Sequence, residues 1–165
     1  MRGSKHIAPL FFNLIMLFGS AYPATTKLTT GMCAKLFPYS DDCSPSKHLG
    51  DSEYCNVFDD DGFLLGYAFA VPVTVHGKQL DLFVGVDENA VVSRVLFTPT
   101  QLADAEFLRQ FKGKTAKDSF DLVEKPEDLI YLPAKIKPMV KHIGVSRSIA
   151  QAVKQVLERA EQLGK

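Results

Sequence analysis

The sequence has no excess of charge of either sign. Lysine and arginine together number 19, as do aspartate and glutamate, so the net charge is +0 at pH 7. No run of basic residues interleaves with aromatic ones, so binding to nucleic acid is not expected. Also missing is any unbroken apolar stretch of about eighteen residues, the length that indicates a membrane-spanning helix. The 165 residues, 46% of them apolar, suffice for one globular domain with a hydrophobic core.

Residues 1–24 differ in composition from the rest of the chain. Arg2 and Lys5 give a basic start, residues 7–18 form a mostly apolar run, and residues 19–21 are small. This pattern predicts a cleaved secretory signal peptide over residues 1–24, with an uncleaved membrane anchor as the alternative. Cleavage would remove two basic residues and no acidic one, which leaves a mature net charge of 17 − 19 = −2. We therefore expect an exported protein, periplasmic or otherwise extracytoplasmic.

Cysteine is scarce, and its three copies all lie in the first third of the expected mature chain, at Cys33, Cys43 and Cys55. In an exported protein these residues predict one disulfide and one free thiol, and three pairings are open. None of them forms the Cys-x-x-Cys pairs typical of zinc or haem sites. His48 stands among acidic residues, but the surrounding segment is polar and contains several serines, so solvated side chains are expected there. No metal site is predicted.

A change to strand-like patterning at residue 54 predicts an antiparallel meander of about four strands, preceded by a polar loop over residues 39–53. The expected strands cover residues 54–58, 63–75, 79–86 and 91–98, with turn sequences between them. The first turn, Asp59-Asp60-Asp61-Gly62, is similar to the start of a calcium-binding loop. It is not followed by the glutamate that such a loop carries at its twelfth position, so we interpret it as a turn.

Helical patterns flank the meander. A short helix is expected over residues 26–37, and a second one over residues 100–111 with Thr100 as its N-cap. The segment that follows contains three prolines and is expected to be irregular. An apolar stripe over residues 149–163 predicts a C-terminal helix. Strands followed by helices predict a single α+β domain over residues 25–165.

The residues before that last helix are Gly144-Val145-Ser146-Arg147-Ser148. A glycine lets a ligand approach the backbone, the two hydroxyls and the arginine attract an anion, and free N–H groups at a helix start favour phosphate. A serine-capped helix without a ligand is the alternative interpretation. The string is also similar to the nucleophile elbow of hydrolases. That function is excluded, because position 148 is serine rather than glycine and no histidine follows Ser146.

Several short motifs occur in an order that resembles one known family. They are Asp61-Gly62 with Gly66-Tyr67-Ala68-Phe69, Leu82-Phe83-Val84-Gly85-Val86-Asp87, Phe107-Leu108-Arg109-Gln110-Phe111-Lys112-Gly113-Lys114, and Gly144-Val145-Ser146-x-Ser148 ahead of an Ala/Val-rich helix, with Leu36-Phe37-Pro38 upstream. Over about residues 36–162 the chain is similar to the extracytoplasmic FMN-binding domain. That domain occurs in the C subunit of the sodium-pumping NADH:quinone oxidoreductase, the G subunit of the Rnf complex and the regulator of nitrous oxide reductase.

The resemblance implies one FMN held at the start of the C-terminal helix. In many members its phosphate is esterified to the threonine that ends a Ser/Thr-Gly-Ala-Thr motif, which aligns here with Ile143-Gly144-Val145-Ser146. Ser146 therefore takes the covalent acceptor position, although isoleucine and valine replace the first hydroxyl residue and the alanine. Covalent FMN, reversible FMN and no FMN stay open. The cofactor-binding candidates are Gly144, Val145, Ser146, Arg147, Ser148 and, from the loop after the last strand, Thr98.

Three functions follow from these patterns. The first is an exported flavoprotein that binds FMN and transfers electrons to or from a membrane-linked redox system. The second is a flavin-free copy of the domain that serves as a binding or assembly module of a redox complex. The third, an enzyme with its own substrate, has the least support, because no spacing of catalytic residues indicates one. FMN is the only expected cofactor.

Overall fold

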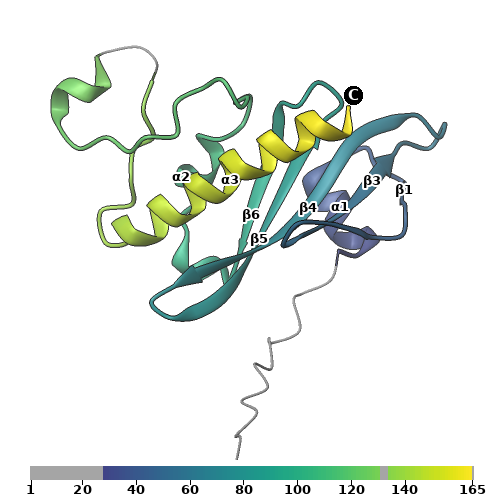
Figure 1. The fold of residues 1–165 in the computed structure, drawn as a ribbon, viewed down its shortest axis with the longest axis horizontal. Coiled ribbons are helices and arrows are strands. Elements are labelled where there is room, and N and C mark those ends of the chain that lie inside the picture. Colours follow the sequence, from purple (N-terminus) through teal and green to yellow (C-terminus); the bar gives the residue numbers. More distant parts are fainter. Residues whose placement is uncertain (1–27, 131–133, 165) are drawn as a thin grey trace, which may run out of the picture.

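The computed structural model describes residues 28–130 and 134–164, which form one α+β domain as the sequence predicts (Figure 1). The predicted signal peptide, residues 1–24, lies outside the described residues. The elements in chain order are α1 (Thr30–Leu36), β1 (Asp42–Cys43), β2 (Lys47–Leu49), β3 (Ser52–Phe58), β4 (Leu64–Val75), β5 (Lys78–Asp87), β6 (Val92–Thr98), the 3-10 turn η1 (Thr100–Leu102), α2 (Ala105–Arg109), the 3-10 turn η2 (Pro126–Leu129) and α3 (Ile143–Leu163).

The sheet is antiparallel and has six strands. Four of them, β3 to β6, pair in chain order and confirm the predicted meander. The short strands β1 and β2 both pair with β3, on the side away from β4. The sequence predicts a polar loop there instead. That prediction is wrong because β1 and β2 are edge strands of two and three residues whose mostly exposed side chains carry no burial pattern.

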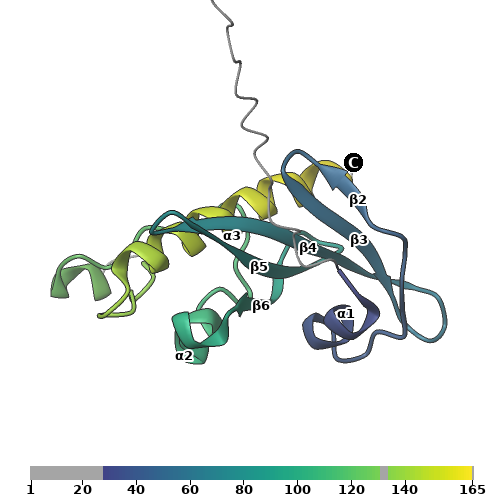
Figure 2. The same cartoon turned by 90° about the horizontal axis from the view of Figure 1, so that it is seen from below.

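The sheet separates two apolar clusters, because successive side chains of a strand point to opposite faces. Along β4, Phe69 and Val71 face α3, whereas Ala68 and Ala70 belong to the smaller cluster with α1. Figure 2 shows α3 along one face of the sheet and α1 under the other. From Ile149 onward, α3 buries its predicted apolar stripe against the sheet, including Ile149, Val153, Val156, Leu157 and Ala160.

Helix α1 is joined to both ends of the meander. Cys33 packs beside Cys55 of β3. At the other end, the Ser93 hydroxyl of β6 donates to the Leu36 carbonyl at 2.9 Å, and the Arg94 guanidinium donates to the Lys35 carbonyl at 2.7 Å. These two donors pair with carbonyls of the last helical turn, which have no partner within the helix.

Gly66 is held in β4 by a close backbone contact. Its φ is +148°, and a Cβ at this position would lie 2.2 Å from the carbonyl oxygen of Val86 on the neighbouring strand. No side chain fits there without moving the strand. The close approach of β4 and β5 therefore accounts for a glycine at this position of the quoted motifs, and no bound ligand is needed to explain it.

The helices differ from their expected bounds. The expected helix over residues 100–111 is split into η1 and α2, because Ala103 and Asp104 adopt extended backbone angles between them. Helix α1 begins at Thr30. Thr29 is its N-cap, and the Thr29 hydroxyl accepts from the Met32 N–H at 3.2 Å. In its described part, the proline-rich segment is irregular apart from η2 and a bridge between residues 122 and 136. Within the described ranges, no helix has both the length and the apolar composition needed to cross a membrane.

Candidate functional site

The predicted phosphate seat, residues 144–148, lies inside α3 rather than ahead of it. The helix begins at Ile143, with His142 at the N-cap position, and the Ser146 N–H already donates to the His142 carbonyl at 2.9 Å. The N–H groups that follow Ser146 are used in the same i to i−4 pattern. Those of residues 143–145 are therefore the ones left for a ligand, which shifts the seat toward the very start of the helix.

Ser146 is fully buried and its hydroxyl is used inside the protein. Its Oγ accepts from the Met139 N–H at 2.9 Å and donates to the His142 carbonyl at 3.0 Å. An ester at this oxygen would remove the hydroxyl proton and require the side chain to leave the interior. The geometry of Ser146 therefore does not fit the covalent FMN attachment that the resemblance implies.

Four other predicted cofactor-binding residues do not converge on one site. Gly144 is exposed, and a Cβ there would meet nothing within 4 Å, so no close approach accounts for this glycine. Val145 is buried in the core below α3. Ser148 lines a small hollow of about 160 Å³ next to β4. Thr98 is exposed at the end of β6, opposite Asp81.

Arg147 is the predicted residue that reaches a large cleft, here called the Arg147 cleft. It has a volume of about 700 Å³ and lies between α3 and the segment that follows α2. From α3 it takes Arg147, Gln151 and Lys154, which the helical repeat places on one face. The full lining is Asp118, Ser119, Phe120, Asp121, Leu122, Glu124, Lys135, Arg147, Gln151 and Lys154.

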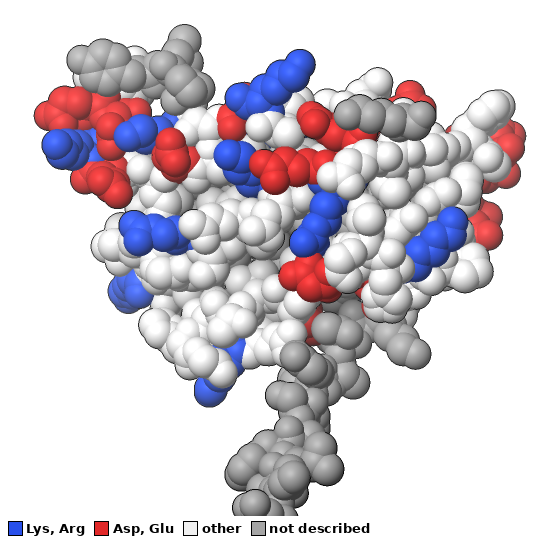
Figure 3. All heavy atoms as spheres, viewed as in Figure 1, with Lys and Arg blue, Asp and Glu red and all other residues white. Residues whose placement is uncertain are grey.

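Three basic and three acidic side chains line the cleft. The basic ones differ in whether they form an ion pair with a nearby carboxylate. Lys135 donates to Asp128 at 2.8 Å, and this bond, with the N–H groups of residues 124 and 125, lowers the pKa of Asp128 to about 2. Arg147 approaches Glu124 only to 4.0 Å, with both side chains exposed. Lys154 has no ion pair among the described residues. Figure 3 shows basic and acidic side chains interspersed on this face.

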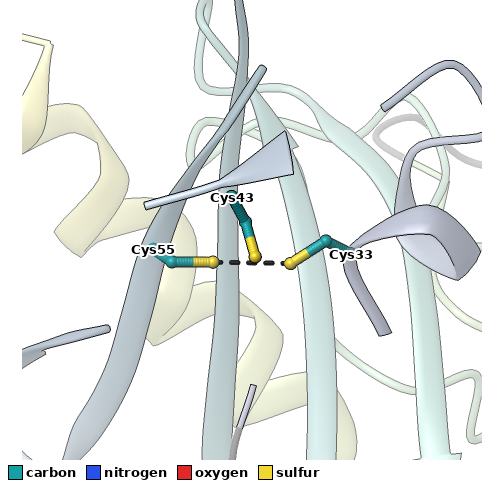
Figure 4. Close-up of side chains that lie close together, drawn as sticks. All are labelled: Cys33, Cys43 and Cys55. Carbon is teal, nitrogen blue, oxygen red and sulfur yellow. Dashed lines mark hydrogen bonds between the residues drawn. The ribbon is translucent and has the colours of Figure 1, made fainter. Parts of the chain in front are cut away.

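A second arrangement was not predicted from the sequence: the three cysteines meet. Cys33 comes from α1, Cys43 from β1 and Cys55 from β3, and their Sγ atoms lie within 4.8 Å of one another. Figure 4 shows the three side chains pointing toward a common centre. Because β1 was not expected, the sequence offered only the proximity of the three cysteines along the chain as a signal.

The three cysteines are free thiols in this structure. Cys33 and Cys55 are buried with their Sγ atoms 3.5 Å apart, whereas a disulfide requires about 2.05 Å. Cys43 is half-buried, and its Sγ lies 3.8 Å from the Thr30 hydroxyl. The hydrogen bond with Cys55, together with burial, raises the pKa of the Cys33 thiol, and burial also raises the pKa of Cys43. The predicted disulfide stays a prediction for the oxidised protein, with Cys33 and Cys55 as the pair already in contact.

His48 and the nearby acidic residues do not converge in the same way. His48 is exposed on β2, opposite Glu53. Asp51 forms an ion pair with Arg159 of α3 at 2.6 Å. Among the described residues, the cysteine cluster is the one group of metal-ligating side chains that lie close together.

The chain matches no protein-family model and no curated protein sequence. The resemblance to the FMN-binding domain therefore rests on the motifs alone and stays a prediction.

Proposed function

We propose that this protein binds FMN reversibly in the Arg147 cleft and carries electrons to or from a membrane-linked redox system outside the cytoplasm. The observation that carries the proposal is the cleft itself. Its volume of about 700 Å³ lies within the roughly 300–1,000 Å³ of small-molecule and cofactor sites, and it is built on the helix that the resemblance assigns to FMN. Bound FMN would supply one-electron or two-electron transfer.

Arg147 and Lys154 are the side chains suited to the phosphate. Both are exposed on the same face of α3, and neither has a close ion pair with a described residue. A guanidinium can donate two parallel hydrogen bonds to a phosphate, and a lysine adds a point charge. Phe120 is half-buried at the opposite wall, where its ring stacks on Phe111 and offers an apolar surface.

The position of Ser146 favours reversible over covalent binding. Its hydroxyl is withdrawn from the surface by two hydrogen bonds, whereas the charged groups of the cleft are exposed. Acid precipitation of protein purified from its own host tests this point. We expect any yellow colour to stay in the supernatant, and colour in the pellet would contradict reversible binding.

Titration of FMN into the apoprotein, followed by quenching of flavin fluorescence, tests the site. Loss of one charge-assisted contact costs about 1.5–3 kcal/mol, which corresponds to at least about tenfold weaker binding for Arg147→Glu. Arg109→Glu is the matched control, because it makes the same charge change at an exposed arginine of α2 that lines a separate cleft of about 430 Å³. Equal affinities of Arg147→Glu and wild type would place FMN elsewhere.

A flavin-free binding or assembly module is the second candidate. It is favoured by the burial of Ser146 and by the exposed apolar residues Val140 and Ile143 beside the start of α3, which are 88% and 51% exposed. In this case the protein is colourless after export from its own host and fails to bind FMN at micromolar concentration. Either candidate assigns electron transfer or assembly, not independent substrate turnover, to the protein.

A further inference from the structure

The cysteine cluster has the dimensions of a metal site. Three sulfurs bound to one ion at about 2.3 Å in a plane lie about 4.0 Å apart, since 2.3 × √3 is about 4.0. The Sγ atoms of Cys33 and Cys55 are 3.5 Å apart, and all three Sγ atoms lie within 4.8 Å of one another. The spacing of a three-sulfur site is thus reached with sub-ångström shifts of the side chains.

The surroundings of the cluster select a soft ion. Thiolates prefer ions such as Cu(I) and Zn(II) to the hard ions Mg²⁺ and Ca²⁺. Structural zinc almost always takes four protein ligands, but the group of nearby ligating residues holds three cysteines and no histidine or carboxylate. Leu36, Val57 and Phe83 are buried in the same apolar cluster, which limits access of water.

We propose that reduced Cys33, Cys43 and Cys55 form a three-thiolate binding site for one Cu(I) ion. Three S–H bonds break, three Cu–S bonds form, and the three protons leave to solvent without any change in oxidation state. The site joins α1, β1 and β3, and it is separate from the Arg147 cleft on α3. Cu(I) binding at this site therefore does not depend on whether the protein binds FMN.

The position of Cys43 decides how ion and solvent reach the site. Cys33 and Cys55 are 0% and 1% exposed, whereas Cys43 is half-buried at the edge of the sheet. Because each of the three thiols must lose its proton to bind the ion, Cu(I) affinity should rise with pH. An oxidised Cys33–Cys55 pair would remove two of the three donors.

The experiment is an anaerobic competition between the reduced full-length protein and a chromogenic Cu(I) chelator. We expect wild type to withdraw one Cu(I) per chain, and Cys43→Ser to bind at least about 100-fold more weakly, since loss of a direct ligand should exceed the roughly 10–100-fold effect of an outer-shell change. Cys43→Ser is preferred to changes at the two buried cysteines, because it leaves the core intact; circular dichroism checks its fold. Thr30→Ala is the matched comparison: it removes the hydroxyl next to Cys43 but keeps all three thiols, so its loss of Cu(I) affinity should stay within the roughly 10–100-fold of an outer-shell change.

Alkylation followed by mass spectrometry gives an independent readout. Bound Cu(I) should protect the half-buried thiol of Cys43 in folded wild type, whereas burial already shields Cys33 and Cys55. Three results would each overturn the proposal: equal Cu(I) affinity of wild type and Cys43→Ser, no protection of the Cys43 thiol by stoichiometric Cu(I), or displacement of Cu(I) by equimolar Zn(II).

Discussion

The hydrogen bonds of Ser146 give a test of the helix start that does not depend on any ligand. In Ser146→Ala the Met139 N–H loses its acceptor in a buried position, because Met139 is only 5% exposed. An unsatisfied buried donor costs about 1–3 kcal/mol. The His142 carbonyl keeps the Ser146 N–H as a donor, so it adds little to the loss. Alanine is a better helix former by about 0.5 kcal/mol, which leaves a net destabilisation of about 0.5–2.5 kcal/mol.

Urea unfolding at equilibrium measures this difference, provided that the m-value stays constant. Ser148→Ala is the matched control, because Ser148 lies two residues further along α3 and its hydroxyl has no hydrogen bond among the described residues. We expect that control to be neutral or slightly stabilised. If Ser146→Ala is as stable as Ser148→Ala, the Ser146 hydroxyl does not hold Met139, and the argument against covalent FMN at this serine fails with it.

Four further outcomes are expected. Gly144→Ala should raise stability by about 0.5–1 kcal/mol in thermal unfolding, because Gly144 is an exposed helical residue with open space around its Cα; a loss of stability would contradict that environment. The Asp128 carboxyl should titrate near pH 2 by NMR. Because its pKa is lowered in the folded protein, its contribution to stability is complete above about pH 3.8 and is lost as the pH falls through 2. A titration near 3.8 would show that Lys135 does not pair with this carboxylate in solution. Oxidation without metal should give a Cys33–Cys55 bridge and one thiol reactive under denaturing conditions, whereas three reactive thiols would refute the bridge. N-terminal sequencing of the exported protein should find a start between residues 22 and 25, and an intact Met1 in the membrane fraction would contradict cleavage.

The sheet was predictable because its strands carry their own burial pattern. In β4 and β5 the side chains that face α3 and those that face α1 alternate along the chain, as with Phe69 and Ala70. Strand β4 is apolar on both faces, and turn sequences mark its ends. By contrast, β1 and β2 have no such pattern, because they are only two and three residues long and their side chains are mostly exposed; it is backbone pairing to β3 that makes them strands.

The start of α3 was missed for a different reason. Gly144 and two serines are typical of a helix cap or a loop, so local propensity predicted a start near residue 149. In the folded protein Val145 extends the buried stripe by one turn, and the Ser146 hydroxyl bonds to a backbone group outside the helix. These tertiary contacts outweigh propensity and cannot be recognised from the helix sequence itself.

The candidate site was predictable only in part. Arg147 was singled out from its own segment, but its partners Phe120 and Lys154 come from an irregular stretch and from the next turns of the helix. The cysteine cluster depends on α1 crossing under the sheet toward β3. That long-range arrangement leaves no periodic signal in the sequence.

Because α1 is attached to both ends of the meander, this short helix links β3 to β6 across one face of the sheet. It contacts β3 through Cys33 and Cys55, and β6 through Ser93 and Arg94. A chain shortened past the first residues of α1 would leave the face with Ala68, Ala70 and Phe83 open to water and the first and last meander strands without a common support. Amide hydrogen exchange at β3 and β6 should then accelerate together, although the two strands do not pair with each other.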